Sequence, residues 1–344
     1  MENFDTTCMK EALALAQLGW GHTNPNPMVG AVVTDASGKI IGRGYHARVG
    51  TAHAEVNAIQ DALRRHGGCA GGTIYVNLEP CCTTGRTPPC TQAILDAGLK
   101  RVVSGALDPN PKHAGKGIEL LRSRGVECVT GVCHEECIEL NRPFFKYITT
   151  GKPFVILKMG MTLDGKIATP GRDSKWITGQ EARSRVQQLR RLADAVMIGG
   201  GTLRADAPQL TVRDPEDWTP QPLRLVASRE MSDEDVAAYF PDGNVERVAP
   251  DSPEAWEELM EDLGSREFMV LLIEGGGELA DCALKAGIVD YVEFHIAPKL
   301  LGGRNSIPVL GGDDPASLDD ALQLHRIKVR FFGGDIAVSG YTEE

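Results

Sequence analysis

Three short stretches in the first half of the chain decide the fold of that half: Thr51-Ala52-His53-Ala54-Glu55, Leu78-Glu79-Pro80-Cys81 and Pro88-Pro89-Cys90. The first lies at the start of a predicted helix, the second ends a predicted strand, and the third starts the next predicted helix. Strands that alternate with helices predict an α/β domain whose helices pack on a sheet. The same three stretches carry residues that bind metals.

The sequence around these stretches continues the alternation. The predicted helices of the first half cover residues 11–18, 52–65, a segment after residue 89, 118–123 and 135–148. The predicted strands cover residues 31–34, 40–44, 73–78, 101–106 and 126–130. Because glycine followed closely by proline is typical of a helix end, Gly151-Lys152-Pro153 predicts a domain boundary, with one domain at 1–150 and another at 151–344.

His53, Cys81 and Cys90 supply one nitrogen and two sulfur atoms, a soft set of ligands that suits zinc. Three protein ligands leave a fourth position for water, which is typical of a catalytic zinc site. Glu55 lies two residues after His53, and we expect it to move a proton beside that water. The pattern matches the zinc-deaminase signature, except that eight residues separate the two cysteines where that signature has two.

Other interpretations of this pattern remain open. The two cysteines are compatible with ordinary buried thiols, and the histidine with a structural role in its helix. A structural zinc site with Cys82 as a fourth ligand is a second alternative, although adjacent residues at a strand end point apart. Glu55 favours catalysis, because a structural site has no need of it.

Composition limits the class of protein. The chain has 344 residues, more than one hydrophobic core usually serves, and a net charge of -11 that excludes a basic surface for non-specific nucleic-acid binding. No apolar run approaches the roughly 20 residues of a membrane span. The first residues lack the pattern of a signal peptide, so we expect a cytoplasmic protein whose nine cysteines are not a disulfide framework.

In the second half, two glycine-rich turns follow apolar strands. The predicted strands cover residues 154–158, 195–198, 223–227, 268–273 and 291–296, and residues 206–218 are predicted as loop. The turns are Gly199-Gly200-Gly201-Thr202 and Gly275-Gly276-Gly277-Glu278, the second before a predicted helix at 279–286. Glycine and a helix N-terminus together suit a phosphate group, but plain tight turns explain the pattern equally well.

The first half resembles the deaminase half of the bifunctional riboflavin-biosynthesis deaminase/reductases. The resemblance rests on His53-Ala54-Glu55-Val56, Leu78-Glu79-Pro80-Cys81, Gly85-Arg86-Thr87-Pro88-Pro89-Cys90, Asn24-Pro25-Asn26-Pro27, Gly44-Tyr45-His46 and Asp108-Pro109-Asn110-Pro111. It implies a cytidine-deaminase-like three-layer domain, zinc ligands at His53, Cys81 and Cys90, and a proton shuttle at Glu55. It also implies that the pyrimidine and ribose phosphate are held by Asn26, His46, Asp108 and Asn110, which their spacing alone would assign to turns.

Two features depart from the family pattern. Cys82-Thr83-Thr84 stands where the family often has Ser-His, and Asn57 stands where it often has a second histidine. Neither position is a predicted zinc ligand, so the departures concern contacts to substrate.

The second half resembles the reductase half of the same family, which has a dihydrofolate-reductase-like α/β fold and uses NADPH. The resemblance rests on the run from Lys158 to Ala168, Ser174-Lys175-Trp176-Ile177-Thr178, Leu210-Thr211-Val212-Arg213, Glu274-Gly275-Gly276 and the run from Ala297 to Gly303. It implies an NADPH site lined by Gly160, Trp176, Thr202, Asp206, Ser228, Gly275, Gly276 and Gly277. It implies substrate contacts from Lys158, Ser174, Arg190, Leu210, Arg213 and Glu274.

Arg190 and Arg213 suit the ribose phosphate because a guanidinium group pairs with phosphate oxygens, although solvated surface charge is the usual role of arginine. Asp206 and Lys158 are candidates for the proton donor of the reduction, which stays unassigned.

The resemblance implies a two-step reaction on one small phosphorylated pyrimidine. A zinc-generated hydroxide deaminates 2,5-diamino-6-(5-phosphoribosylamino)pyrimidin-4-one, and NADPH then reduces the ribosyl group of the aminouracil product to ribityl. We expect no nucleic-acid or membrane partner, and a homo-oligomer. The alternatives are a tRNA- or nucleic-acid-editing zinc deaminase with an accessory domain, and a zinc-stabilised binding module without catalysis.

Overall fold

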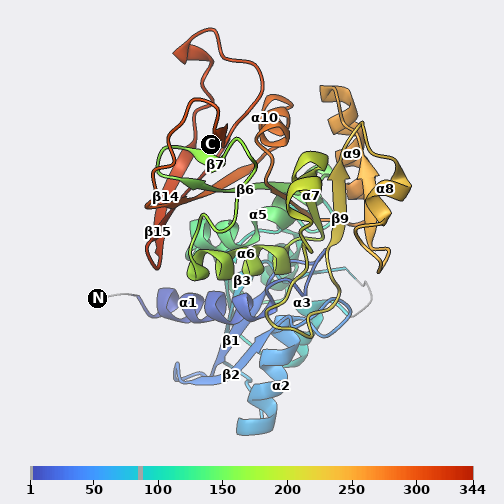
Figure 1. The fold of residues 1–344 in the computed structure, drawn as a ribbon. Helices are drawn as coiled ribbons and strands as arrows, with labels where there is room; N and C mark the ends of the chain where they lie inside the picture. Colours follow the sequence, from blue (N-terminus) through green and yellow to red (C-terminus); the bar gives the residue numbers. More distant parts are fainter. Residues whose placement is uncertain (1–2, 84–87, 344) are drawn as a thin grey trace. The chain divides into compact units, whose positions relative to one another are not determined.

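Contacts divide the chain into two units, Met1–Gly151 and Lys152–Glu344, whose elements Figure 1 shows in sequence colours. The computed structural model describes residues 3–83 and 88–343. The units meet one residue after the predicted boundary. The assignment of deamination to residues 1–150 and of reduction to residues 151–344 stays a prediction.

A five-stranded sheet with strand order β2-β1-β3-β4-β5 forms the centre of the first unit. Its strands are β1 (Gly30–Thr34), β2 (Ile40–Tyr45), β3 (Thr73–Leu78), β4 (Arg101–Ala106) and β5 (Glu127–Thr130). β1 runs antiparallel to both of its neighbours, whereas β3, β4 and β5 are parallel. The carboxyl ends of the parallel strands therefore lie at one edge, where connecting loops build a site.

In the part of this unit that the structure describes, five α-helices cover the two faces of the sheet. They are α1 (Phe4–Ala16), α2 (Ala54–His66), α3 (Cys90–Asp96), α4 (Lys116–Ser123) and α5 (His134–Thr150), with a 3-10 helix, η1 (Gln17–Gly19), after α1. Side chains of α2, α3 and α4 share one core with the strands. A Cβ at Gly30 would meet the backbone of α1, so α1 packs on the opposite face and the unit has the predicted three layers.

Two helix starts differ from the sequence prediction. The first helix begins at Phe4 instead of residue 11, because the Asn3 side chain accepts a hydrogen bond from the Asp5 backbone and caps it. α2 begins at Ala54 instead of residue 52, because His53 is extended and forms its N-cap.

An eight-stranded sheet with order β10-β9-β8-β11-β6-β12-β15-β14 forms the second unit. Its strands are β6 (Phe154–Thr162), β8 (Ala195–Gly199), β9 (Leu223–Ala227), β10 (Val245–Val248), β11 (Val270–Glu274), β12 (Tyr291–Ala297), β14 (His325–Phe332) and β15 (Asp335–Tyr341), and β7 (Lys166–Ala168) pairs separately with β13 (Ile307–Pro308). The strands from β10 to β12 are parallel, and β15 and β14 add an antiparallel edge. The predicted mixed α/β class is confirmed.

The helices of the second unit are α6 (Gln180–Leu192), α7 (Gly200–Asp206), α8 (Asp233–Ala237), α9 (Pro253–Ser265) and α10 (Gly277–Lys285), with a 3-10 helix, η2 (Leu318–Asp320). α9 and α10 pack with alternate strand residues such as Leu157 and Met159 in one core. Lys158 lies between these two in sequence, so its side chain is on the other face of the sheet. On that face, Arg190 and Arg185 of α6 form ion pairs with carboxylates of the sheet.

Candidate active sites

The N-terminus of α2 is fixed by close packing on β2. A Cβ at Gly44 would lie 2.3 Å from the backbone nitrogen of Ala58, so only glycine lets the helix approach the strand this closely. His53 occupies the N-cap position of the helix, and Glu55 lies in its first turn with 3% of its surface exposed. The motif is thus held against the sheet at the helix end.

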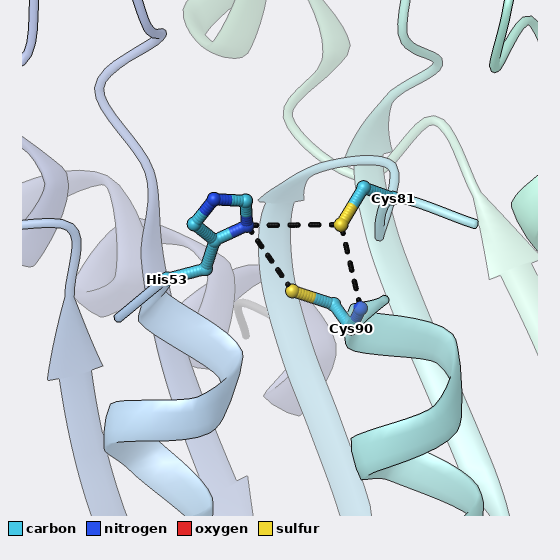
Figure 2. Close-up of side chains that lie close together, drawn as sticks. All are labelled: His53, Cys81 and Cys90. Atoms are coloured by element: carbon cyan, nitrogen blue, oxygen red, sulfur yellow. Dashed lines mark hydrogen bonds between the residues drawn. The ribbon is translucent and has the colours of Figure 1, made fainter. Parts of the chain in front are cut away.

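His53, Cys81 and Cys90 converge on one point, as Figure 2 shows. His53 Nδ1 lies 3.7 Å from Cys81 Sγ and 3.3 Å from Cys90 Sγ, and the Cys90 backbone nitrogen donates to Cys81 Sγ at 3.3 Å. Three or more histidine, cysteine or acidic side chains can share a metal ion only if their ligand atoms lie close together. Among residues 3–83 and 88–343, these three are the one group that meets this condition. A nitrogen and two sulfurs within 4.8 Å of one another fit zinc.

The electrostatics of the group favour a thiolate at Cys81. Its pKa is lowered to about 4, because Cys90 donates a hydrogen bond to its sulfur and His53 lies beside it, which together outweigh burial. Zinc binds the thiolate form of cysteine. Glu55 behaves in the opposite way: burial, with a contribution from Cys81, raises its pKa to about 7. A carboxyl group with a pKa near neutrality both accepts and donates a proton.

Cys82 turns away from the metal group. Its sulfur lies 3.6 Å from Nδ1 of His113. Cys82 lies outside the group of ligand atoms that could share a metal ion, which argues against a fourth ligand at this position.

Two of the four predicted deaminase substrate residues lie together beside His53. The Asn26 amide nitrogen and His46 Nε2 are 3.2 Å apart, and the ring centres of His46 and His53 are 5.3 Å apart. His46 Nδ1 lies 3.2 Å from the carbonyl oxygen of Ala52, and burial lowers the pKa of His46. Asn26 and His46 thus form a polar wall next to the metal ligands.

Asp108 and Asn110 lie in the loop that follows β4, and Glu79 holds that loop. The Asp108 carboxylate accepts from the Asn110 backbone at 2.8 Å, and burial raises the pKa of Asp108. Glu79, 3% exposed, accepts from the backbone nitrogens of Asp108, Gly115 and Gly117 at 2.8 to 3.1 Å. A Cβ at Gly117 would lie 2.3 Å from the carbonyl oxygen of Pro80, so this crossing requires glycine.

Glu79 was not among the predicted site residues, although it stands two residues before a predicted ligand. A glutamate at a strand end is equally common on the surface, and only the tertiary fold brings the loop's amide groups to it. The departure at Asn57 has a structural explanation, because its side chain donates to the carbonyl oxygens of Tyr45 and Ala52. Thr84, another position that departs from the family pattern, lies outside the described residues. Residues 85–87 of the family insertion lie outside them too.

The second unit contains a cavity of about 990 Å³. It lies at the carboxyl ends of the parallel strands, where open α/β sheets bind their ligands. Every residue predicted for the reductase lines it: Lys158, Gly160, Ser174, Trp176, Arg190, Thr202, Asp206, Leu210, Arg213, Ser228, Glu274, Gly275, Gly276 and Gly277. The resemblance therefore selected residues that the fold brings together from distant parts of the sequence.

The glycine turn after β11 suits a phosphate group. Gly275 and Gly276 have φ angles of 81° and 88°, a conformation that favours glycine, and α10 begins directly at Gly277. The glycine turn and the first residues of α10 line the cavity, and amide groups at a helix N-terminus suit a phosphate group. The predicted helix started at residue 279, two residues late.

Arg190 is buried, so surface charge is the wrong interpretation of this residue. Its Nε and Nη2 donate to the two carboxylate oxygens of Glu274 at 2.6 and 2.8 Å, and its Nη1 donates to the Thr211 carbonyl at 3.0 Å. Burial opposes charge on Glu274, but Arg190 overcomes it and lowers the pKa of that carboxyl. Arg213 is exposed and makes one long side-chain hydrogen bond, to Gln209 at 3.4 Å.

The two candidate proton donors differ in their surroundings. The Asp206 carboxylate accepts from the Ser174 hydroxyl at 2.7 Å. Lys158 Nζ has no hydrogen-bond partner in the described part of the chain, and burial lowers its pKa.

Trp176 is 64% exposed at the cavity wall, with the Arg183 guanidinium 4.7 Å from the centre of its ring.

Comparison with known proteins decides the family. Residues 2–106 match the cytidine and deoxycytidylate deaminase zinc-binding region, and residues 153–338 match the RibD C-terminal domain. The riboflavin biosynthesis protein RibD of Aquifex aeolicus is 40% identical over 98% of both chains, and that of Actinobacillus pleuropneumoniae is 40% identical over 96% of this chain and 94% of its own.

The chain belongs to the RibD family.

Solved structures agree with this family. Acinetobacter baumannii RibD superposes with a TM-score of 0.85 at 34% identity, over 98% of both chains. A Thermotoga maritima protein described as a diaminohydroxyphosphoribosylaminopyrimidine deaminase/5-amino-6-(5-phosphoribosylamino)uracil reductase gives a TM-score of 0.87 at 34% identity, over 98% of both chains. As a RibD, this chain is a bifunctional enzyme of riboflavin biosynthesis, with a zinc-binding deaminase domain and an NADPH-using reductase domain.

The predictions of fold class, activity and cofactors are therefore confirmed, and the editing deaminase and the non-catalytic binding module are excluded as descriptions of the whole chain. In the ranges that the structure describes, no helix combines the length and the apolar character of a membrane span.

Proposed function

We propose that the RibD deaminase site of this chain acts on 2,5-diamino-6-(5-phosphoribosylamino)pyrimidin-4-one through His53, Cys81, Cys90 and Glu55. The convergence of the three ligand atoms beside a buried carboxyl group carries the proposal. Zinc, when bound, supplies a Lewis acid that activates water near neutral pH. Glu55 takes a proton from the attacking water and delivers it to the departing ammonia, a role that suits its raised pKa.

The polar groups around the metal ligands bind the substrate in this proposal. Asn26 and His46 face the pyrimidine, since they pair with each other beside His53. Asp108 and Asn110 hold the ribose phosphate end from a loop that Glu79 anchors by three backbone hydrogen bonds. Residues 1–150 carry this activity.

The reductase activity belongs to residues 151–344 in this proposal, and the glycine turn at residues 275–277 receives a phosphate of the cofactor. NADPH, when bound, supplies the hydride that forms a new C1′–H bond on the sugar. The C1′–O4′ bond breaks, its electron pair stays on O4′, and Lys158 donates the proton that O4′ takes up. Lys158 is favoured over Asp206 because its ammonium has no hydrogen-bond partner in the described residues, whereas Asp206 already accepts from Ser174.

Arg213 is the proposed ligand of the substrate phosphate. Arg190 is less suited to that role, because Glu274 and the Thr211 carbonyl occupy its guanidinium group. Arg190 instead fixes the carboxylate of Glu274 at the cavity wall, and Glu274 contacts the substrate.

We further propose that the protein is a cytoplasmic homo-oligomer without a nucleic-acid partner. The edge strand β14 exposes Ile327, Val329 and Phe331, with 51%, 57% and 72% of their surfaces accessible. Apolar side chains on an open sheet edge favour association with a second copy. Analytical ultracentrifugation tests this, because a monomer at micromolar concentration contradicts it.

A paired assay of Glu55→Ala tests the central proposal. We expect ammonia release to fall by about 10²- to 10⁴-fold, the usual contribution of general acid–base catalysis. NADPH oxidation should persist when the deaminated intermediate is supplied, and zinc content should stay at the wild-type level. If the variant still deaminates at the wild-type rate, the role of Glu55 is wrong. If the wild-type enzyme does not oxidise NADPH with that intermediate, the reductase assignment is wrong.

A further inference from the structure

Lys158 stands in the middle of a row of charged side chains that crosses three neighbouring strands. In the register of the parallel strands, Lys158 of β6 lies opposite Glu274 of β11 on one side and opposite Glu293 of β12 on the other. Residues in register on parallel strands project to the same face. The row is therefore carboxylate, ammonium, carboxylate, and α6 covers it.

Each carboxylate of the row is held by an arginine from α6. Arg190 binds Glu274 with two hydrogen bonds, and Arg185 binds Glu293 with two more, both at 3.0 Å. Glu293 is 1% exposed and does not line the cavity, whereas Glu274 does. Glu274 is thus available to substrate, and Glu293 reaches the reaction only through Lys158.

A buried histidine completes the far side of the row. His295 lies two residues along β12, opposite Gly160, and its Nε2 is 2.8 Å from a carboxylate oxygen of Glu293. Burial lowers the pKa of His295, and the hydrogen bond to Glu293 opposes that effect. Because a carboxylate only accepts hydrogen bonds, Nε2 is the donor of this pair. Its Nδ1 is buried without a hydrogen-bond partner in the described residues. Such a costly arrangement is retained where a polar network serves a purpose beyond packing.

We propose that Glu293, held by Arg185 and His295, is a positioning residue of the reductase that keeps the Lys158 ammonium directed into the cavity. The proposal rests on the proposed role of Lys158 as proton donor. Arg185 and His295 occupy both oxygens of Glu293, so its carboxylate cannot rotate away, and it attracts Lys158 as a fixed charge. Glu274, in register on the other side of Lys158, attracts the ammonium from the opposite direction.

The charged groups around Lys158 set the direction of a pH test. They are Glu274 of β11, Arg185 and Arg190 of α6, Glu293 and His295 of β12, and Asp335 of β15. Burial lowers the pKa of Lys158, and the three carboxylates oppose that effect. Loss of the Glu293 charge must therefore lower this pKa further, and Arg185, left without its partner, adds to the change.

Glu293→Gln is the first variant, with Glu246→Gln as its matched control. Glu246 also accepts two hydrogen bonds from one arginine, Arg266, but this pair is half-exposed and does not line the cavity. In enzyme without NADPH, competitive labelling with acetic anhydride followed by mass spectrometry measures the pH midpoint of Lys158. We expect the midpoint to fall by about one pH unit or more in Glu293→Gln and to stay unchanged in the control.

Reduction kinetics give the second measurement. With the deaminated intermediate supplied, the high-pH limb of kcat should move down by the same amount in Glu293→Gln, while KM for NADPH and the rate of ammonia release stay unchanged. A midpoint and a kcat profile that both match wild type overturn the proposal and leave the cluster a structural role only.

Two further variants separate folding from function. Arg185→Met/Glu293→Leu removes both charges without leaving either one buried and unpaired, a replacement that folded proteins often tolerate. We expect it to shift the Lys158 midpoint in the same direction and by less, and a wild-type midpoint in this variant contradicts the proposal even if Glu293→Gln fails to fold. Lys158→Met tests the underlying role: if it reduces the intermediate at the wild-type rate, Lys158 is not the proton donor, whatever Glu293 does to its titration.

Discussion

The two sites of this RibD are built in different ways. The deaminase site consists of the three side chains of the metal group and one buried carboxyl group, from short segments at residues 53–55, 81 and 90. Two of these segments lie at helix starts, and the third lies in the loop that follows β3. The reductase cavity collects residues from Lys158 to Glu278 and beyond, and a buried Arg190–Glu274 ion pair forms part of its wall. The first site depends on a few ligand atoms, whereas the second depends on the sheet that carries it.

This difference predicts how each site fails. Removal of one ligand should abolish the first activity and leave the remaining fold in place. Changes at the cavity should act in smaller steps, because many residues share the binding and several of them also stabilise the second unit. Four experiments, on both sites, test that contrast.

Cys90→Ser should have the largest effect. Even residues that only support metal ligands cost about 10- to 100-fold in metal affinity or activity, so loss of a sulfur ligand should remove zinc and reduce ammonia release by more than roughly 100-fold. Metal analysis and an ammonia assay measure this, and a chelator should produce the same loss in wild type. Cys69→Ser, at a buried cysteine away from the metal group, is the control. Full zinc content in Cys90→Ser would contradict the ligand assignment.

Arg190→Met should destabilise the second unit. It leaves the Glu274 carboxylate buried without its partner, which costs about 3–5 kcal/mol in the free energy of unfolding. Denaturant unfolding measures the loss, and ammonia release should persist at denaturant concentrations where NADPH oxidation has ended. Arg266→Met, in an exposed ion pair, should cost at most about 1 kcal/mol. If the two variants lose the same free energy of unfolding, the buried ion pair is no more important for stability than the exposed one.

Acid should weaken the second unit through Glu293. Burial alone raises its pKa, but hydrogen bonds from His295 and Arg185 overcome burial and lower it to about 2 from its ordinary value of 4.5. A depressed carboxyl pKa stabilises the fold above the unfolded value, and this contribution, roughly 3 kcal/mol, disappears as the pH falls from about 4.5 to about 2. Urea unfolding at several acidic pH values measures it. Glu293→Gln should lose this part of the pH dependence, and an unchanged slope would refute the assignment.

Arg213→Ala should have the smallest effect. Loss of a charged hydrogen bond to the substrate phosphate costs about 1.5–3 kcal/mol, so KM for the deaminated intermediate should rise about tenfold or more. KM for NADPH should not change, because the proposed contact is to substrate. Steady-state NADPH oxidation gives both constants. A rise in KM for NADPH alone would place Arg213 on the cofactor.

Local patterns in the sequence predicted much of the fold and of the metal group. Periodicity predicted all five strands of the first unit, and the ligand types and helix starts predicted the position of His53, Cys81 and Cys90. In the second unit, β10, β14 and β15 of the large sheet and the short strands β7 and β13 were missed. In β14, apolar Ile327, Val329 and Phe331 alternate with charged residues as in a half-exposed strand.

Residue types and their spacing thus predicted the chemistry: the soft ligand set, the carboxyl group beside it, the glycine turns and, through the family resemblance, the two activities. Tertiary structure alone decided which charges meet. Glu79 with the amides of the 108–117 loop, Arg190 with Glu274, and Arg185 with Glu293 are separated by 29 to 108 positions in the sequence. Such contacts follow from strand order and register, which depend on how the whole sheet assembles and leave no local pattern in the sequence.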